Sequence, residues 1–135
     1  MGIDARERIF VYGSLRKDVA ESRNHLLAQS ADFVGLARAR GRLFQVSWYP
    51  GLVCDDGHEG WVQGEVYELA DVAETLARLD AYERCGPDDP EPHTFERVKR
   101  EIWLLSGEWI EAWTYLYVGP MADARLVPSG DYAKT

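Results

Sequence analysis

Residues 71–84 are the only segment whose apolar side chains recur at the spacing of a long amphipathic helix. Val72, Leu76 and Leu79 follow one another at intervals of four and three residues, which places them in one stripe along a helix. A chain with one such helix must build most of its core from another kind of element, and strands are the remaining choice.

Both ends of this helix are marked in the sequence. Asp71 is a residue type that favours the N-cap position, and Glu74 follows three residues later, as in a capping box. Beyond Arg84, Gly86 and the proline after it stop the helix. We therefore expect the helix to run from Asp71 to about Arg84.

β-Branched and aromatic residues dominate five segments around the helix. These segments are residues 8–12, 33–48, 61–69, 95–105 and 108–118. Gly35 and Gly41 indicate bulged or curved strands, and Ser106-Gly107 indicates a hairpin between the last two segments. The strands do not alternate regularly with helices, so we expect an α+β fold whose mainly antiparallel sheet can close into a barrel.

Turn and loop signals separate these segments. Tyr49-Pro50-Gly51 and Asp55-Asp56-Gly57 predict turns. Residues 24–27 predict a short helix after a polar loop, and the proline-rich, acidic residues 85–94 predict a loop. Residues 120–135 are rich in turn formers, and we expect them at the surface.

The composition limits the classes of protein to consider. Hydrophobic residues make up 46% of the 135 residues, which is typical of one globular domain spanning residues 1–135. The net charge of −8 argues against a nucleic-acid partner, which would favour a basic face. No apolar run is long enough for a membrane span, and the start has no signal-peptide core. With only Cys54 and Cys85 as cysteines, we expect a reduced, cytoplasmic protein.

Glu83 places a carboxylate in the apolar stripe of the helix. At about 100° per residue, position 83 falls in the middle of the apolar arc, whereas Asp80 and Arg84 fall outside it. A carboxylate on a buried face must be paired, hydrogen-bonded or protonated. Desolvation raises its pKa, which suits a general acid or base. The alternative is a carboxylate that turns to solvent or pairs with an arginine from a strand.

The loop that follows the first strand is a candidate anion site. It contains Tyr12, Gly13, Ser14 and Leu15. Gly13 allows backbone conformations in which successive N–H groups form one concavity, a nest that binds a carboxylate, and Ser14 adds a hydroxyl. The Gly-Lys-Ser/Thr ending of a P-loop is missing. An ordinary turn at the end of a strand fits the same residues.

Other chemically active side chains give weaker signals. His25, His58 and His93 are far apart, and the spacing of Cys54 and His58 fits no zinc pattern, so we predict no metal site. Either cysteine beside a histidine would suit a nucleophile, although buried thiols more often serve the core. Four alternating aromatic residues are expected in the core or on a sheet face: Trp109, Trp113, Tyr115 and Tyr117.

Several short segments, taken together and in order, resemble the γ-glutamylcyclotransferase-like family. They are FVYGSLR at 10–16, NHLL at 24–27, GRLF at 41–44, YPGL at 49–52, VQGEVY at 62–67, LDAYE at 79–83, FER at 95–97 and AWTY at 112–115. The resemblance covers most of the chain, to about Val118.

This resemblance implies a small mixed, mainly antiparallel β-barrel flanked by a few helices, with a cavity at one end. It implies a cofactor-free intramolecular acyl transfer in which a small-molecule γ-glutamyl substrate cyclises to 5-oxoproline and releases an amine. Glu83 takes the position of the family's catalytic carboxylate. The substrate-binding positions that it implies are Tyr12, Gly13, Ser14, Leu15 and Tyr115.

Two departures from the family pattern bear on the substrate. Glycine often follows the catalytic glutamate directly, whereas Arg84 and Cys85 come before Gly86 here. Tyrosine often stands where this chain has Phe95. A γ-glutamyl amine, such as a γ-glutamyl-lysine-type product, or a γ-glutamyl dipeptide is expected ahead of glutathione, because the loop is unlike that of the glutathione-acting branch.

Two other functions fit the same residues. A module that binds a γ-glutamyl or 5-oxoproline-like molecule without turnover would keep the pocket. An interaction protein would use its exposed aromatic side chains for docking, and its function would survive Glu83→Gln. No motif indicates an oligomeric state.

Overall fold

The computed structural model describes residues 7–19, 22–54 and 60–134, and its strands form one eight-stranded sheet. The strands are β1 (Arg8–Val11), β2 (Ala31–Arg40), β3 (Arg42–Val46), β4 (Tyr49–Val53), β5 (Trp61–Leu69), β6 (Phe95–Leu104), β7 (Trp109–Tyr117) and β8 (Arg125–Leu126). The helices are α1 (His25–Ala28), α2 (Val72–Tyr82) and the 3₁₀ helix η1 (Tyr132–Lys134).

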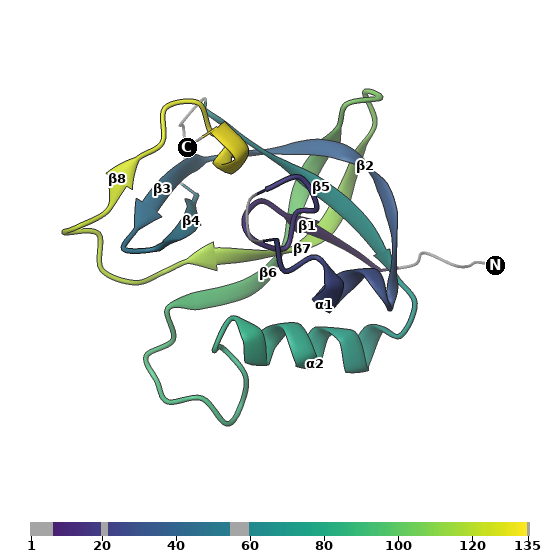
Figure 1. The fold of residues 1–135 in the computed structure, drawn as a ribbon, viewed down its shortest axis with the longest axis horizontal. Coiled ribbons are helices and arrows are strands. Elements are labelled where there is room, and N and C mark those ends of the chain that lie inside the picture. The colour runs from purple at the N-terminus through teal and green to yellow at the C-terminus, as the bar shows by residue number, and fades with distance from the viewer. Residues whose placement is uncertain (1–6, 20–21, 55–59, 135) are drawn as a thin grey trace.

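Five of the strands close into a barrel in the order β1-β5-β2-β6-β7. The closing contact is parallel and joins Ile9 of β1 to Trp113 of β7. The strands β4, β3 and β8 continue the sheet outward from β7. In Figure 1, α2 runs along one side of the barrel, and the β3–β4 hairpin lies toward the end at which α2 stops. The expected α+β fold with a mixed, mainly antiparallel barrel is therefore confirmed.

The long strands follow the sequence pattern closely. The register of β2 against β5 shifts between Phe33 and Gly35, as expected of a bulge. The strands β6 and β7 pair from Phe95↔Tyr117 to Trp103↔Trp109, so the hairpin prediction holds. Gly107 lies in its turn with a φ of 105°, a conformation that other residues rarely adopt.

Two apolar clusters fill the structure. One joins the barrel to the helices through Leu27 of α1 and Leu76 and Leu79 of α2. The other draws its buried side chains from strands and the residue after β1, and includes Phe10 and Val66. No residue of β5 is exposed, although the strand contains Gln63, Glu65 and Glu68.

The predicted turn at Tyr49-Pro50-Gly51 is wrong, because these residues form the first part of β4. The chain reverses one step earlier, at Ser47 and Trp48, so that Val46 pairs with Tyr49. Ser47 has a φ of 58°, which supplies the positive φ that two-residue hairpins require. Proline at position 50 lacks an N–H donor, but β4 pairs with β7 only at Leu52↔Leu116, so little ladder is lost. The other predicted turn, Asp55-Asp56-Gly57, lies outside the described residues.

Helix α2 begins as expected and ends two residues early. The Asp71 side chain caps it by accepting a hydrogen bond from the Glu74 amide at 3.5 Å. The last helical residue is Tyr82, and Glu83 is the C-cap. None of the helices in the described part of the chain combines the length and the apolar character that crossing a membrane requires.

The tail after β7 lies mostly at the surface but is firmly attached. Strand β8 pairs with β3, and the Gln63 amide donates to the Gly130 carbonyl at 2.7 Å. Gly130 has a φ of 67°, and a Cβ there would lie 2.0 Å from the Trp61 carbonyl oxygen, so only glycine fits. Asp131 accepts a hydrogen bond from the buried Arg16 guanidinium at 2.9 Å.

Candidate functional site

A pocket of about 490 Å³ opens between the end of β1, the end of α2, the β3–β4 hairpin and the start of β6. Its volume lies in the range of small-molecule sites. The structure brings all six residues singled out from the sequence to its wall: Tyr12, Gly13, Ser14, Leu15, Glu83 and Tyr115. Residues more than 100 positions apart in the chain therefore share one cavity.

Glu83 has no polar partner in the described part of the chain. Its backbone N–H donates to Leu79, but no described residue donates a hydrogen bond or contributes an ion pair to its carboxylate. Burial raises the pKa of Glu83 to about 7. The carboxyl group can therefore hold or release a proton near neutral pH.

The residue after Glu83 shapes the end of the helix. Arg84 has a φ of 58°, in the left-handed region. Its N–H donates to the Ala81 carbonyl at 3.1 Å, and the Cys85 N–H donates to the Asp80 carbonyl at 2.9 Å. These two bonds form a Schellman motif, in which glycine is the usual left-handed residue. The missing glycine noted in the sequence is thus replaced by an arginine in the same kind of conformation.

The loop after β1 presents free backbone donors at the pocket. The N–H groups of Gly13, Ser14 and Leu15 have no hydrogen-bond partner among the described residues. A Cβ on Gly13 would lie 2.8 Å from Cγ of Pro50, so the close approach of the loop to β4 requires glycine. Three consecutive unpaired amides at a pocket wall suit an anionic group.

The loop is held in place from behind. Asn24 donates through Nδ2 to the Leu15 carbonyl and to the Tyr67 hydroxyl, both at 2.9 Å. Tyr67 donates to Oε1 of the fully buried Glu65 at 2.8 Å, and the same oxygen accepts from the Lys17 N–H at 3.0 Å. These contacts tie the loop to Asn24 and to β5 through side chains that do not line the pocket.

Tyr12 contributes its ring and backbone to the pocket, while its hydroxyl is engaged elsewhere. The hydroxyl donates to the Tyr115 carbonyl at 2.7 Å and accepts from the Leu52 N–H at 3.1 Å. Burial, together with the nearby Glu83, raises the pKa of Tyr12 well above its usual value. Tyr12 therefore fixes the loop against β7 and β4 and does not exchange protons. The Ser14 hydroxyl lies 2.8 Å from the Tyr82 hydroxyl and ties the loop to the end of α2.

Asp80, which the helical projection places outside the apolar arc, nevertheless packs against two strands. Asp80 accepts hydrogen bonds from Arg97 at 2.7 and 3.0 Å and from the Tyr115 hydroxyl at 2.6 Å. Burial alone would raise the pKa of Asp80, but these hydrogen bonds outweigh it and hold the pKa below its usual range. Asp80 thus fastens the helix to β6 and β7 directly behind Glu83. A helical projection could not show this contact, because both partners come from strands distant in sequence.

The alternative chemistries receive no support from the described residues. Neither Cys54 nor Cys85 forms a disulfide, and burial raises the pKa of Cys85 to about 12, which makes it a poor nucleophile. No cluster of three His, Cys, Asp or Glu side chains suited to a metal ion occurs in residues 7–19, 22–54 and 60–134. His58 lies outside these ranges.

Sequence comparison places the chain among named relatives. Residues 9–134 match the family model described as "Gamma-glutamyl cyclotransferase, AIG2-like". A Methanocaldococcus jannaschii protein named "Putative gamma-glutamylcyclotransferase" is 34% identical over 126 residues, covering 93% of this chain and 95% of its own. The "Gamma-glutamylcyclotransferase family protein YtfP" of Escherichia coli is 32% identical over 125 residues, with coverage of 93% and 95%.

Solved structures share the fold. The crystal structure of YkqA from Bacillus subtilis superimposes with a TM-score of 0.72 at 28% identity, covering 95% of this chain and 40% of that one. An AIG2-like protein from Mus musculus superimposes with a TM-score of 0.65 at 24% identity, with coverage of 87% and 82%. The barrel with its flanking helices is therefore a recurrent architecture.

Proposed function

The chain belongs to the AIG2-like gamma-glutamyl cyclotransferase family, and from that membership we propose that it converts a small γ-glutamyl compound to 5-oxoproline and a free amine. The observation that carries the proposal is the half-buried Glu83 carboxylate, which has no partner among the described residues and lies in the same pocket as three backbone amides without a described partner. A proton acceptor and an anion cradle are two of the groups that this reaction needs from a protein, beside donors for the developing oxyanion.

Glu83 acts as the proton carrier. The α-ammonium group of the substrate must lose a proton before its nitrogen can attack, and an ionised Glu83 accepts that proton. The α-nitrogen then forms a bond to the γ-carbonyl carbon, and the bond from that carbon to the leaving nitrogen breaks. Glu83 returns this proton to the leaving nitrogen, then accepts the second proton that the ring nitrogen must lose to become an amide and passes it to the departing amine. The amine leaves as an ammonium ion, and the enzyme ends in its starting state. A pKa of about 7 suits both directions of transfer.

The loop amides hold the substrate. The N–H groups of Gly13, Ser14 and Leu15 bind the α-carboxylate, which anchors the γ-glutamyl arm in a folded conformation. Because the nucleophile and the carbonyl belong to one molecule, this folding supplies much of the rate advantage. The attack needs no cofactor, since the substrate carries both reacting groups.

The test is release of 5-oxoproline from a panel of γ-glutamyl amino acids and γ-glutamyl amines. We expect product with the wild type and a loss of about 100- to 10,000-fold with Glu83→Gln. Glu101→Gln, at an exposed position on β6, is the matched control and should retain wild-type activity. Circular dichroism checks that each variant is folded.

Two results would contradict the proposal. Full activity of Glu83→Gln would exclude this carboxylate as the proton carrier. Binding of 5-oxoproline without turnover of any panel member would instead show a binding module.

A further inference from the structure

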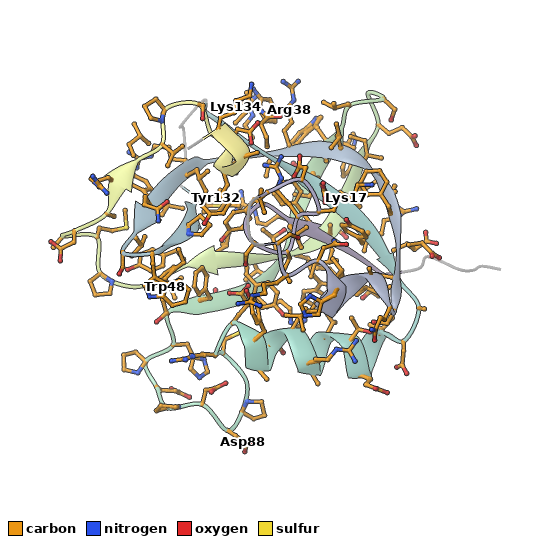
Figure 2. The ribbon with its side chains drawn as sticks, in the orientation of Figure 1. Lys17, Arg38, Trp48, Asp88, Tyr132 and Lys134 are labelled. Carbon is orange, nitrogen blue, oxygen red and sulfur yellow. The ribbon has the colours of Figure 1, made fainter. Side chains whose placement is uncertain are left out.

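The pocket extends beyond Glu83 and the loop into a region that we call the aromatic annex, formed by Trp48, Tyr49, Pro50 and Phe95. The Trp48 and Tyr49 rings meet edge to face with centroids 5.3 Å apart, and Tyr49 meets Phe95 at 5.8 Å. Figure 2 shows Trp48 beside the β3–β4 hairpin, on the side of the molecule from which the loop carrying Asp88 extends. The annex therefore borders the mouth of the pocket.

Trp48 leaves most of its surface available. Its side chain is 81% exposed, although Tyr49 beside it is half-buried and Phe95 is buried. Large apolar side chains that stay exposed at the rim of a pocket commonly mark a contact for a ligand. The Ser47-Trp48 turn fixes the backbone here, so the indole is presented on a tight hairpin and not on a long loop.

Charge is scarce in the pocket. Among its lining residues, Glu83 and Arg84 alone carry charged side chains. Arg84 is exposed and has no ion-pair or hydrogen-bond partner for its side chain among the described residues. The annex thus has no group to pair with a charged substituent, whereas Arg84 offers one cation that can pair with a carboxylate.

We propose that the annex binds the leaving part of a γ-glutamyl amino acid whose own side chain is apolar or aromatic. This inference rests on the proposed function, because the leaving group must extend outward from the carbonyl held near Glu83. The side chain of the leaving amino acid packs against Trp48 and Tyr49, and its α-carboxylate faces Arg84. A leaving group with an acidic side chain gains nothing from the aromatic wall and loses hydration there.

The first experiment compares kcat/KM for γ-glutamyl-phenylalanine, γ-glutamyl-glycine and γ-glutamyl-aspartate. We expect the phenylalanine compound to exceed each of the other two by about tenfold or more, the scale that one apolar side chain in a pocket provides. Equal or lower values for γ-glutamyl-phenylalanine would overturn the inference.

Variants then assign the preference to residues. Trp48→Ala should lower the ratio of kcat/KM for phenylalanine over glycine by about fivefold or more. Trp109→Ala removes another exposed indole, 59% exposed and outside the pocket lining, and should leave the ratio unchanged. If the ratio is unchanged in Trp48→Ala, or falls equally in both variants, the aromatic annex does not select the side chain of the leaving amino acid.

The carboxylate contact is tested with γ-glutamyl-phenethylamine, which keeps the ring and lacks the carboxylate. The wild type should process it several-fold more slowly than γ-glutamyl-phenylalanine, and Arg84→Gln should remove that difference. Arg125→Gln, at an exposed position on β8, is the charge control. Faster turnover of the phenethylamine compound would overturn the assignment of an amino acid as leaving group.

Binding separates failure of the inference from failure of the proposed function. If no compound yields 5-oxoproline, the proposed function fails, yet the annex can still be tested by calorimetric titration of Glu83→Gln. A Kd for γ-glutamyl-phenylalanine at least about tenfold below that for γ-glutamyl-glycine would support the annex. Equal Kd values would overturn it whatever the activity.

Discussion

Two carboxylates near the end of α2, Asp80 and Glu83, lie in contrasting environments. Asp80 and Glu83 are three residues apart, so their side chains leave the helix in neighbouring directions. Asp80 meets Arg97 and the Tyr115 hydroxyl within 3.0 Å. Glu83 faces the pocket and meets no donor among the described residues.

The comparison shows that partners, rather than burial, set the role of each carboxylate. Burial tends to raise the pKa of both groups, but hydrogen bonds to Asp80 reverse the effect, and nothing reverses it for Glu83. The Asp80 side therefore holds the helix against the barrel, while the Glu83 side keeps a carboxyl group that titrates near neutrality.

The largest expected effect is on the pH dependence of the reaction. In the proposed reaction the base is the ionised form of Glu83, whose pKa is about 7. We expect kcat/KM to rise about tenfold per pH unit well below pH 7 and then level off, a change of about 50-fold between pH 5 and 7. A midpoint near the ordinary glutamate value in the initial-rate profile would show that the group is solvated or is not the base.

The next effect is on stability and concerns the paired side. Asp80→Asn leaves the Arg97 guanidinium without its anion, and we expect the free energy of unfolding to fall by about 1–3 kcal/mol in urea denaturation at pH 7. Solvent access to Arg97 keeps the value toward the lower end of that range. Asp88→Asn, in the exposed loop after α2, should change stability little.

The difference in the free energy of unfolding between wild type and Asp80→Asn should disappear at low pH. The pKa of Asp80 is lowered by folding, so its contribution to stability is present above the unfolded value of 3.8 and is lost as the pH falls through the folded value. Wild type and Asp80→Asn should therefore converge in strong acid. A constant gap across the pH range would mean that the destabilisation comes from packing and not from charge.

Glu83 should affect the free energy of unfolding in the opposite direction. Folding raises the pKa of Glu83 from 4.5 to about 7, so the ionised group costs stability progressively as the pH rises through that interval. Glu83→Gln should raise the free energy of unfolding by about 1–2 kcal/mol at pH 8 and change it little at pH 4.5. A destabilised Glu83→Gln at pH 8 would contradict the absence of a partner for this carboxylate.

The smallest expected effect is on stability and concerns Arg84, which follows the C-cap of α2. Arg84→Gly relieves a left-handed conformation that costs a non-glycine residue about 1 kcal/mol, and we expect a gain of about 0.5–1 kcal/mol in thermal or urea unfolding. Arg84→Ala keeps the strain and removes the charge, so it serves as the control. A gain of equal size in both variants would point to charge instead of backbone conformation.

Much of the fold was predictable because its signals are local. The stripe of α2, its cap at Asp71 and the β6–β7 hairpin each depend on residues close together in the chain. The prediction of a turn at Tyr49-Pro50-Gly51 was wrong because the chain reverses two residues earlier, at Ser47, whose φ is positive. Closure through Ile9 and Trp113 joins segments about 100 residues apart, which no local pattern encodes.

The residues of the candidate site could be singled out from the sequence only where they interrupt a local pattern. Glu83 broke a periodic pattern, and Gly13 marked the loop, so both were visible as local exceptions. The partners of Asp80 and the annex around Trp48 depend on how strands pack against the helix end and the hairpin. An exposed tryptophan in a turn carries no periodic signal, so sequence reasoning had no means of finding it.

The segment after β8 is linked to the loop that lines the pocket through the ion pair between Asp131 and Arg16. The Arg16 guanidinium is shared between Asp18 and Asp131, and Arg16 follows directly on the loop that presents the amides. Proteolytic cleavage after Pro128 would remove Asp131 and leave the buried Arg16 with Asp18 as its anionic partner. It would also remove the Gly130 carbonyl, which accepts from the Gln63 N–H of β5. Asp131 thus holds Arg16 across 115 positions of the chain, so removal of the segment that carries Asp131 would disturb the neighbouring loop of Gly13, Ser14 and Leu15.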